Sequence, residues 1–250
     1  YNMCQMSKSK IILFVVGMFV LTGGIIGGAA FWAIAIDGKE VRGAKNGAGS
    51  RVFLMAAVDH DTASVIGQEA IGEKTNEIPH FPVLLDQLGD LTGTVITADA
   101  LHTQREHAET LHARGAHYVF TVKANQPSLR DRIASQTWAS LPAQHVQHEK
   151  AHGRTTTWAI TTQPAQTWIG FPHATQTIRL TRDRMHHRTG ETTREQIYAI
   201  TSLTPAQASP ENLAALIRGH WVIENRLHWV RDVTYDEDRS QIRTANGPRI

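Results

Sequence analysis

Cysteine is nearly absent from this chain of 250 residues, since Cys4 is the single one. An intrachain disulfide is therefore excluded, and so is a zinc site built from several cysteines. An excess of one charge is also lacking, because 25 Lys and Arg residues stand against 23 Asp and Glu residues. This balance gives no electrostatic argument for nucleic acid as a partner. With 41% hydrophobic and 19% charged residues, global disorder is excluded and a packed core is expected.

Charge is missing altogether from residues 11–36, which follow two lysines. An apolar run of about 18 or more residues is typical of a transmembrane helix, and lysines before such a run also fit a signal peptide. We therefore expect residues 1–30 to form an atypical N-terminal segment that spans a membrane through residues 11–30.

From residue 31 onward, β-prone runs alternate with helical patterns. A buried strand over residues 31–36 is expected to end at Asp37, and the runs 51–59 and 64–71 predict a hairpin. Alternating helices and strands then follow, at 76–88, 93–98, 103–114, 116–122 and 127 to about 139. This order predicts an α/β fold, with a mixed sheet and helices on its faces.

An antiparallel β insertion is predicted at about residues 150–205, because threonine-rich alternating runs replace the helical periodicity there. The runs lie at 154–162, 175–182 and 193–202. A helical pattern resumes at Pro210, a residue favoured in the first turn of a helix. It predicts one long helix from there to about Val233.

Three acidic residues stand where we expect chemistry. Asp37 follows the first strand, Asp99 follows the fourth, and Glu224 lies in the last helix. The carboxyl ends of neighbouring parallel strands meet at one edge of a sheet, so Asp37 and Asp99 should lie close together. Glu224 joins them if the last helix packs across that edge. Converging carboxylates repel one another unless a cation lies between them, and their hard oxygens suit Mg²⁺ or Mn²⁺. Taken singly, an Asp after a strand is more often a turn residue or a helix cap.

Five short motifs occur in order along the chain. They are IAIDGK at 34–39, TADA at 97–100, YVFTVKANQP at 118–127, HGR at 152–154 and HWVIENRLHW at 220–229. Together they closely resemble the DDE transposases of bacterial insertion sequences, in the branch with a β-strand insertion between the second Asp and the Glu. The resemblance covers about residues 33–250.

This resemblance implies a ribonuclease-H-like catalytic domain over residues 31–250. It implies that Asp37, Asp99 and Glu224 are the catalytic and metal-binding residues, with two Mg²⁺ or Mn²⁺ ions as cofactors. The implied reaction is metal-dependent hydrolysis at transposon ends, followed by attack of the freed 3′-hydroxyl on target DNA. The implied partners are double-stranded DNA and, because the chemistry is two-ended, a second copy of the chain. The implied location is the cytoplasm, on the nucleoid, or the membrane if the N-terminal segment inserts.

Further DNA contacts are predicted from three polar residues that follow strand ends on the same edge: Lys39, Lys123 and Asn125. Relatives often carry Tyr, Arg and Lys around the third carboxylate, where this chain has Ile217, His220 and Arg231. His220 and Arg231 can still contact phosphate, whereas Ile217 cannot. For all of these positions, simple packing or solvation is the alternative.

Two other interpretations stay open. His148, Glu149 and His152 match the HExxH motif of zinc proteases, which with a membrane span suggests a membrane-anchored metalloprotease. That motif requires a helix, and this polar segment has little helical periodicity. The short stretches before the first motif and after the last one also predict a chain truncated or fused at both ends. A fragment without catalysis, or a small membrane protein, is the non-enzymatic interpretation.

Overall fold

The computed structural model describes residues 31–45, 51–71, 77–221, 223–236 and 239. The membrane span predicted for residues 11–30 lies outside this part of the chain. Among the residues that are described, no helix is both long and apolar enough to cross a membrane.

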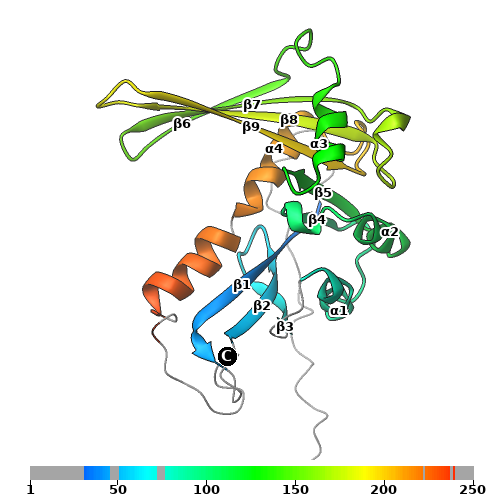
Figure 1. Ribbon diagram of the computed structural model, residues 1–250, viewed down its shortest axis with the longest axis vertical. Helices are drawn as coiled ribbons and strands as arrows, with labels where there is room; N and C mark the ends of the chain where they lie inside the picture. Colours follow the sequence, from blue (N-terminus) through cyan, green and yellow to red (C-terminus); the bar gives the residue numbers. More distant parts are fainter. Residues whose placement is uncertain (1–30, 46–50, 72–76, 222, 237–238, 240–250) are drawn as a thin grey trace, which may run out of the picture.

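Nine strands of the described chain form one mixed sheet, in the order β3-β2-β1-β4-β5-β9-β8-β7-β6 (Figure 1). Their bounds are β1 Ala33–Lys45, β2 Arg51–Asp59, β3 Val65–Ile71, β4 Val95–Ala98, β5 His117–Val122, β6 His145–Ala151, β7 Arg154–Pro164, β8 Gln176–His186 and β9 Thr192–Thr201. Strands β1, β4 and β5 are parallel to one another, and all the other neighbours are antiparallel. We call β3, β2, β1, β4 and β5 the core half, and β9, β8, β7 and β6 the insertion.

Helices cover both faces of the core half. They are α1 Phe81–Asp86, α2 Arg105–Ala113, α3 Pro127–Ala134 and α4 Pro210–Gly219, with short 3-10 turns η1 Ile78–His80, η2 Ala100–His102 and η3 Thr167–Ile169. Two π-helical segments follow α4, namely η4 Ile223–His228 and η5 Val230–Thr234. Figure 1 shows α1 and α2 on one side of β1, and η4 with η5 on the other.

Alternation along β1 explains this layering. Side chains two residues apart in a strand point to the same face. Ile34 and Ile36 lie in the cluster that contains Phe81 of α1, whereas Ala35 lies in a different cluster with Ile223 of η4. The apolar alternation of β1 therefore supplies one face for each helical layer. The predicted mixed α/β sheet with flanking helices is confirmed.

Three predicted boundaries are wrong. Strand β1 continues past Asp37 to Lys45, because its outer part pairs with β2 alone. The helix predicted at 76–88 shrinks to α1, since Pro79 and Pro82 lack the N–H groups that a longer helix needs. The helix predicted at 127–139 ends at Ala134.

The long helix predicted from Pro210 to Val233 is broken. Helix α4 ends at Gly219, and η4 and η5 continue in π-helical geometry. A methyl group on Gly219 would overlap the ring of His60, so the backbone approaches the turn after β2 closely there. Beyond this point, Ile223 of η4 packs with Ala35 of β1 and with Ala56 and Val58 of β2.

Candidate active site

Asp37 and Asp99 lie side by side where the parallel pairing of β1 with β4 ends. The register of β1 and β4 pairs Ile36 with Ala98, and each aspartate is the next residue in its chain. Asp37 stays within β1, paired with Ala56 of β2, whereas Asp99 begins the turn after β4. The predicted meeting of these two carboxylates at one sheet edge is therefore what the register produces.

Backbone amides fix the orientation of both carboxylates. The Gly38 N–H donates to Asp37 Oδ1 at 2.9 Å, and the Leu101 N–H donates to Asp99 Oδ1 at 2.8 Å. One oxygen of each group is thus engaged by its own turn. Asp37 points to the same face as Ala35, which is the face that carries Glu224 on η4.

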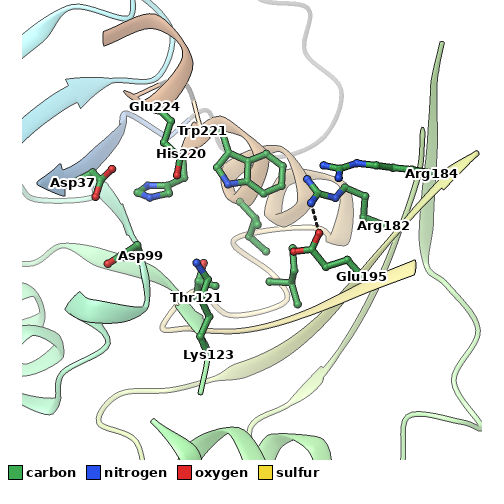
Figure 2. Close-up of a pocket in the computed structure, with 12 residues that line it drawn as sticks. Asp37, Asp99, Thr121, Lys123, Arg182, Arg184, Glu195, His220, Trp221 and Glu224 are labelled. Carbon is green, nitrogen blue, oxygen red and sulfur yellow. Dashed lines mark hydrogen bonds and ion pairs between the residues drawn. The ribbon is translucent and has the colours of Figure 1, made fainter. Parts of the chain in front are cut away.

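These carboxylates line one pocket of about 410 Å³ with Glu224 (Figure 2). Its wall combines acidic, basic and apolar side chains: Asp37, Asp99, Thr121, Lys123, Arg182, Arg184, Glu195, Ile197, Ile217, His220, Trp221 and Glu224. Figure 2 shows Asp37, Asp99 and Glu224 at one end, and Arg182 with Arg184 at the other. The pocket therefore joins an acidic end in the core half to a basic end in the insertion.

The negative charges at the acidic end of the pocket are not balanced by the histidine next to them. Burial, together with the negative charges of Asp99, Glu77 and Glu224, raises the pKa of Asp37 to about 7, although the Gly38 N–H acts to lower it. His228 Nδ1 lies 3.6 Å from Asp37 Oδ2, but burial, with the charges of Lys39 and Arg231, lowers the pKa of His228 to about 4. A neutral imidazole does not cancel the carboxylate charge.

Chemically, this oxygen-rich set fits a hard divalent cation better than a soft metal. In the part of the chain that the structure describes, however, no group of three or more His, Cys, Asp or Glu side chains is arranged so that it could hold a metal ion. Glu224 is exposed on the first turn of η4, where its side chain has room to turn.

Three side chains next to the acidic end form a buried hydrogen-bonded network. Thr97 Oγ1 lies 2.8 Å from His60 Nε2 and 3.2 Å from His220 Nδ1. His220 is only 6% exposed, and burial lowers its pKa to about 4, so its ring is neutral at pH 7. Its Nε2 has no hydrogen-bond partner among the described atoms, although the residue lines the pocket. His220 therefore brings a neutral ring, and no positive charge, to the wall of the pocket.

The predicted DNA-contacting residues divide into exposed and paired groups. Lys123 is exposed and lines the pocket. Asn125 donates to the Ala100 carbonyl at 2.6 Å, which ties the loop after β5 to the turn after Asp99. Lys39 does not follow a strand end as predicted: it lies within β1, its side chain is 8% exposed, and it forms an ion pair with Asp232 of η5. Arg231 lies in the same π-helical segment.

Sequence reasoning missed the basic end of the pocket. Arg182 lies over Trp158 and Trp221, with its guanidinium carbon 5.1 Å and 5.4 Å from the ring centroids, and forms an ion pair with Glu195. Arg184, two residues on along β8, lines the same pocket. The spacing was the available signal, since arginines two apart in a strand share a face.

The predicted zinc-protease motif is wrong as a helical site. His148 and Glu149 lie in β6, paired with β7, and His148 Nδ1 is 2.9 Å from Thr157 Oγ1. His152 occupies the turn to β7 with a φ of 50°. Because the motif needs both histidines on one helical face, a strand and its turn cannot supply that geometry.

The chain is similar in sequence to known proteins over most of its length. The family model described as "Transposase DDE domain" matches residues 29–249. The "Putative protein YbfL" and the "H repeat-associated putative transposase YhhI", both of Escherichia coli K12, are each 30% identical over 233 residues. These alignments cover 87% of this chain and 60% of each relative. The chain thus spans about 60% of the length of these curated relatives.

Among solved structures, the cryo-EM structure of the piggyBac transposase synaptic complex with hairpin DNA is similar at 12% sequence identity and a TM-score of 0.44. The match covers 87% of this chain and 43% of that one. At this distance the likeness supports no functional inference.

Proposed function

Since the chain belongs to the transposase DDE domain family, we propose that it catalyses metal-dependent DNA cleavage at transposon ends, followed by strand transfer. The observation that carries the proposal is the placement of Asp37 and Asp99 directly after the parallel pairing of β1 with β4, facing a pocket shared with Glu224. Asp37, Asp99 and Glu224 are the proposed catalytic residues.

A ribonuclease-H-like core is part of this proposal. The order β3-β2-β1-β4-β5, with parallel β1, β4 and β5, supports it. The insertion continues that sheet through the pairing of β5 with β9 and lies in the chain between Asp99 and Glu224. This is the position that the resemblance implies for the β insertion of the family branch.

Two Mg²⁺ or Mn²⁺ ions are the proposed cofactors. When bound, such ions activate the attacking oxygen and stabilise the leaving oxygen of a phosphodiester. The chain's own part is to present oxygen ligands in fixed orientation, which the Gly38 and Leu101 amides provide for Asp37 and Asp99. Glu224 completes the set by turning toward them from η4.

The basic end of the pocket is the proposed path of the DNA backbone. Lys123, Arg182 and Arg184 line it, and phosphate contacts position a duplex without reading its sequence. Arg182 is pre-oriented by the two tryptophans and Glu195, so little side-chain entropy is lost on binding.

The other predicted DNA-contacting residues have different roles in the proposal. His220 lines the pocket as a neutral ring, so its proposed contact with phosphate is a hydrogen bond and not an ion pair. Arg231 is proposed to contact the DNA backbone beside η4. Lys39, through its ion pair with Asp232, and Asn125, through its hydrogen bond to Ala100, stabilise the site instead. Because two transposon ends react together, the proposed assembly on nucleoid DNA is a homodimer.

Nicking of supercoiled plasmid tests this function. We expect the chain to nick in the presence of Mn²⁺ and to stop on addition of EDTA. Asp99→Asn and Glu224→Gln should each reduce the rate by at least about 100-fold, since each removes a charged ligand. Asp183→Asn is the control, because it removes a carboxylate from β8 that pairs with Arg194 outside the pocket. Equal nicking by all four proteins, or no nicking by folded wild type, contradicts the proposal.

A DNA-binding fragment without catalysis is the second candidate. It is favoured by one observation, that the described residues contain no ready-made group of three metal ligands. Plasmid binding by wild type that survives Glu224→Gln, without any nicking, would establish it.

A further inference from the structure

Glu77 is a fourth carboxylate beside the proposed catalytic pair, and it comes from an element that sequence reasoning did not associate with the site. It lies immediately before η1. A methyl group on Gly38 would overlap its carboxyl group, so the Glu77 carboxylate occupies the space above Gly38. Because Gly38 follows Asp37 in β1, the two carboxylates flank the same strand from opposite faces.

His102 holds Glu77 in this position. The His102 side chain is fully buried, and its Nε2 lies 3.2 Å from Glu77 Oε2. Its Nδ1 is buried without a hydrogen-bond partner among the described atoms. The tautomer that donates from Nε2 to the carboxylate leaves no N–H unpaired, so it is the one that the geometry favours.

The His102 ring is itself fixed. It packs against the rings of Phe81 and His107, with centroid separations of 5.2 Å and 5.5 Å. His102 also ends η2, the turn that Asp99 begins and caps. Glu77 therefore links the turn after Asp99 to the point of β1 where Asp37 stands.

The charge of Glu77 is felt at the site. Among the neighbouring carboxylates that raise the pKa of Asp37, Glu77 comes after Asp99 and ahead of Glu224. A negative charge held this close to two carboxylates adds to their attraction for a cation.

We propose that Glu77, held by His102, is a positioning residue that strengthens binding of a divalent cation at Asp37 and Asp99. The inference rests on the proposed function, because that function supplies the cation. Glu77 acts through its charge and through the tether between β1 and η2, and it does not line the pocket.

Glu69 offers a matched control. Its Oε1 lies 3.6 Å from His80 Nδ1, and its side chain is 23% exposed, against 22% for Glu77. Both are therefore glutamates of similar burial beside a histidine, but Glu69 is not among the groups that shift the pKa of Asp37.

The test is a titration of the metal-free full chain with Mn²⁺, in which the free ion is followed by electron paramagnetic resonance. Glu77→Gln should weaken binding by about tenfold, the effect of one nearby charge at partial burial. Glu69→Gln should stay within about twofold of wild type, and Asp99→Asn should lose the site. Glu77→Asp keeps the charge and should recover most of the affinity, which separates a charge effect from misfolding.

The outcomes separate the two proposals. Wild-type affinity in Glu77→Gln, together with loss in Asp99→Asn, overturns the role of Glu77 and leaves the proposed function standing. Equal weakening by Glu69→Gln and Glu77→Gln also overturns that role, because any surface charge would then suffice. A folded wild type that binds no Mn²⁺ contradicts the proposed function itself.

Discussion

The core half and the insertion share one sheet but differ in burial, most clearly between β4 at its centre and β6 at its edge. All four residues of β4 are buried, and helices cover both faces around it. In β6, by contrast, the five inner residues are exposed and only the two end residues are partly buried. The centre of the core half is thus suited to keep side chains in fixed positions, whereas β6 at the edge of the insertion is open to solvent. The pocket lies where the two meet.

The two faces of the insertion repeat the contrast on a smaller scale. The register pairs Arg182 with Glu195 and Asp183 with Arg194, so the two ion pairs point to opposite faces. Arg182 and Glu195 line the pocket, whereas Arg194 has a side chain that is 72% exposed. Two arginine–carboxylate ion pairs therefore lie in different environments, one lining the pocket and one on the opposite face.

Truncating a large core side chain should give the largest effect on stability. Phe81 is fully buried and stacks on His107 at a centroid distance of 4.0 Å. Phe81→Ala should lower the free energy of unfolding by about 3–5 kcal/mol, whereas Val146→Ala on exposed β6 should cost less than about 1 kcal/mol. Urea denaturation of both variants checks this. Similar losses in the two would break the contrast between the halves.

Acid should destabilise the protein through buried histidines of the core half. Burial lowers the pKa of His60 and of His107 from 6.5 to about 4. Between these values the unfolded chain binds protons that the folded chain excludes, so the free energy of unfolding decreases as the pH falls through this window. We expect about 2 kcal/mol from each histidine.

Urea midpoints at pH 6.5 and pH 4.5 measure that loss. His60→Gln keeps a polar partner for Thr97 but does not titrate, so it should recover about 1–2 kcal/mol of the acid loss. An acid loss identical to that of wild type would contradict the buried, neutral state of His60.

Removing one pocket arginine should weaken DNA binding moderately. Arg184→Ala should lower the affinity for a short duplex by about five- to tenfold and reduce the salt dependence by about one counterion. Arg194→Ala on the opposite face should stay within about twofold. Fluorescence anisotropy at several salt concentrations gives both quantities. If the two variants weaken binding equally, the pocket face is not the DNA face.

The exposed ion pair should have the smallest effect. Hydrogen bonding to Arg194 lowers the pKa of Asp183, with N–O distances of 2.6 Å and 2.7 Å. Because solvent screens such a pair, Asp183→Asn should change the free energy of unfolding by less than about 1 kcal/mol. A thermal melt that shows a larger loss of stability would mean that this ion pair stabilises the insertion more than its exposure to solvent indicates.

Local patterns predicted what is set locally. The apolar runs located the strands of the core half, and the sequence motifs led to Asp37, Asp99 and Glu224. The meeting of Asp37 with Asp99 followed from the rule for adjacent parallel strands, which needs no knowledge of side-chain packing.

Features that depend on distant contacts were missed. The last helix breaks where Gly219 approaches the ring of His60, and Lys39 is buried in an ion pair with Asp232, which is distant in sequence. Glu77 lies beside the site because His102 holds its carboxylate and Gly38 leaves room for it on the far face of β1. The spacing of Arg182 and Arg184 predicts that they share a face of β8. The sequence does not say that this face meets the pocket.

Localised backbone cleavage by bound iron tests the central claim most directly. Fe²⁺ binds oxygen and nitrogen sites somewhat more tightly than Mn²⁺, and with ascorbate and peroxide it cuts the chain next to the ion. We predict cuts near Asp37, after Asp99 and near Glu224, all lost in Asp99→Asn and in excess Mg²⁺. Cuts elsewhere, or a pattern unchanged by Asp99→Asn, would contradict a divalent-cation site at the junction of the two halves.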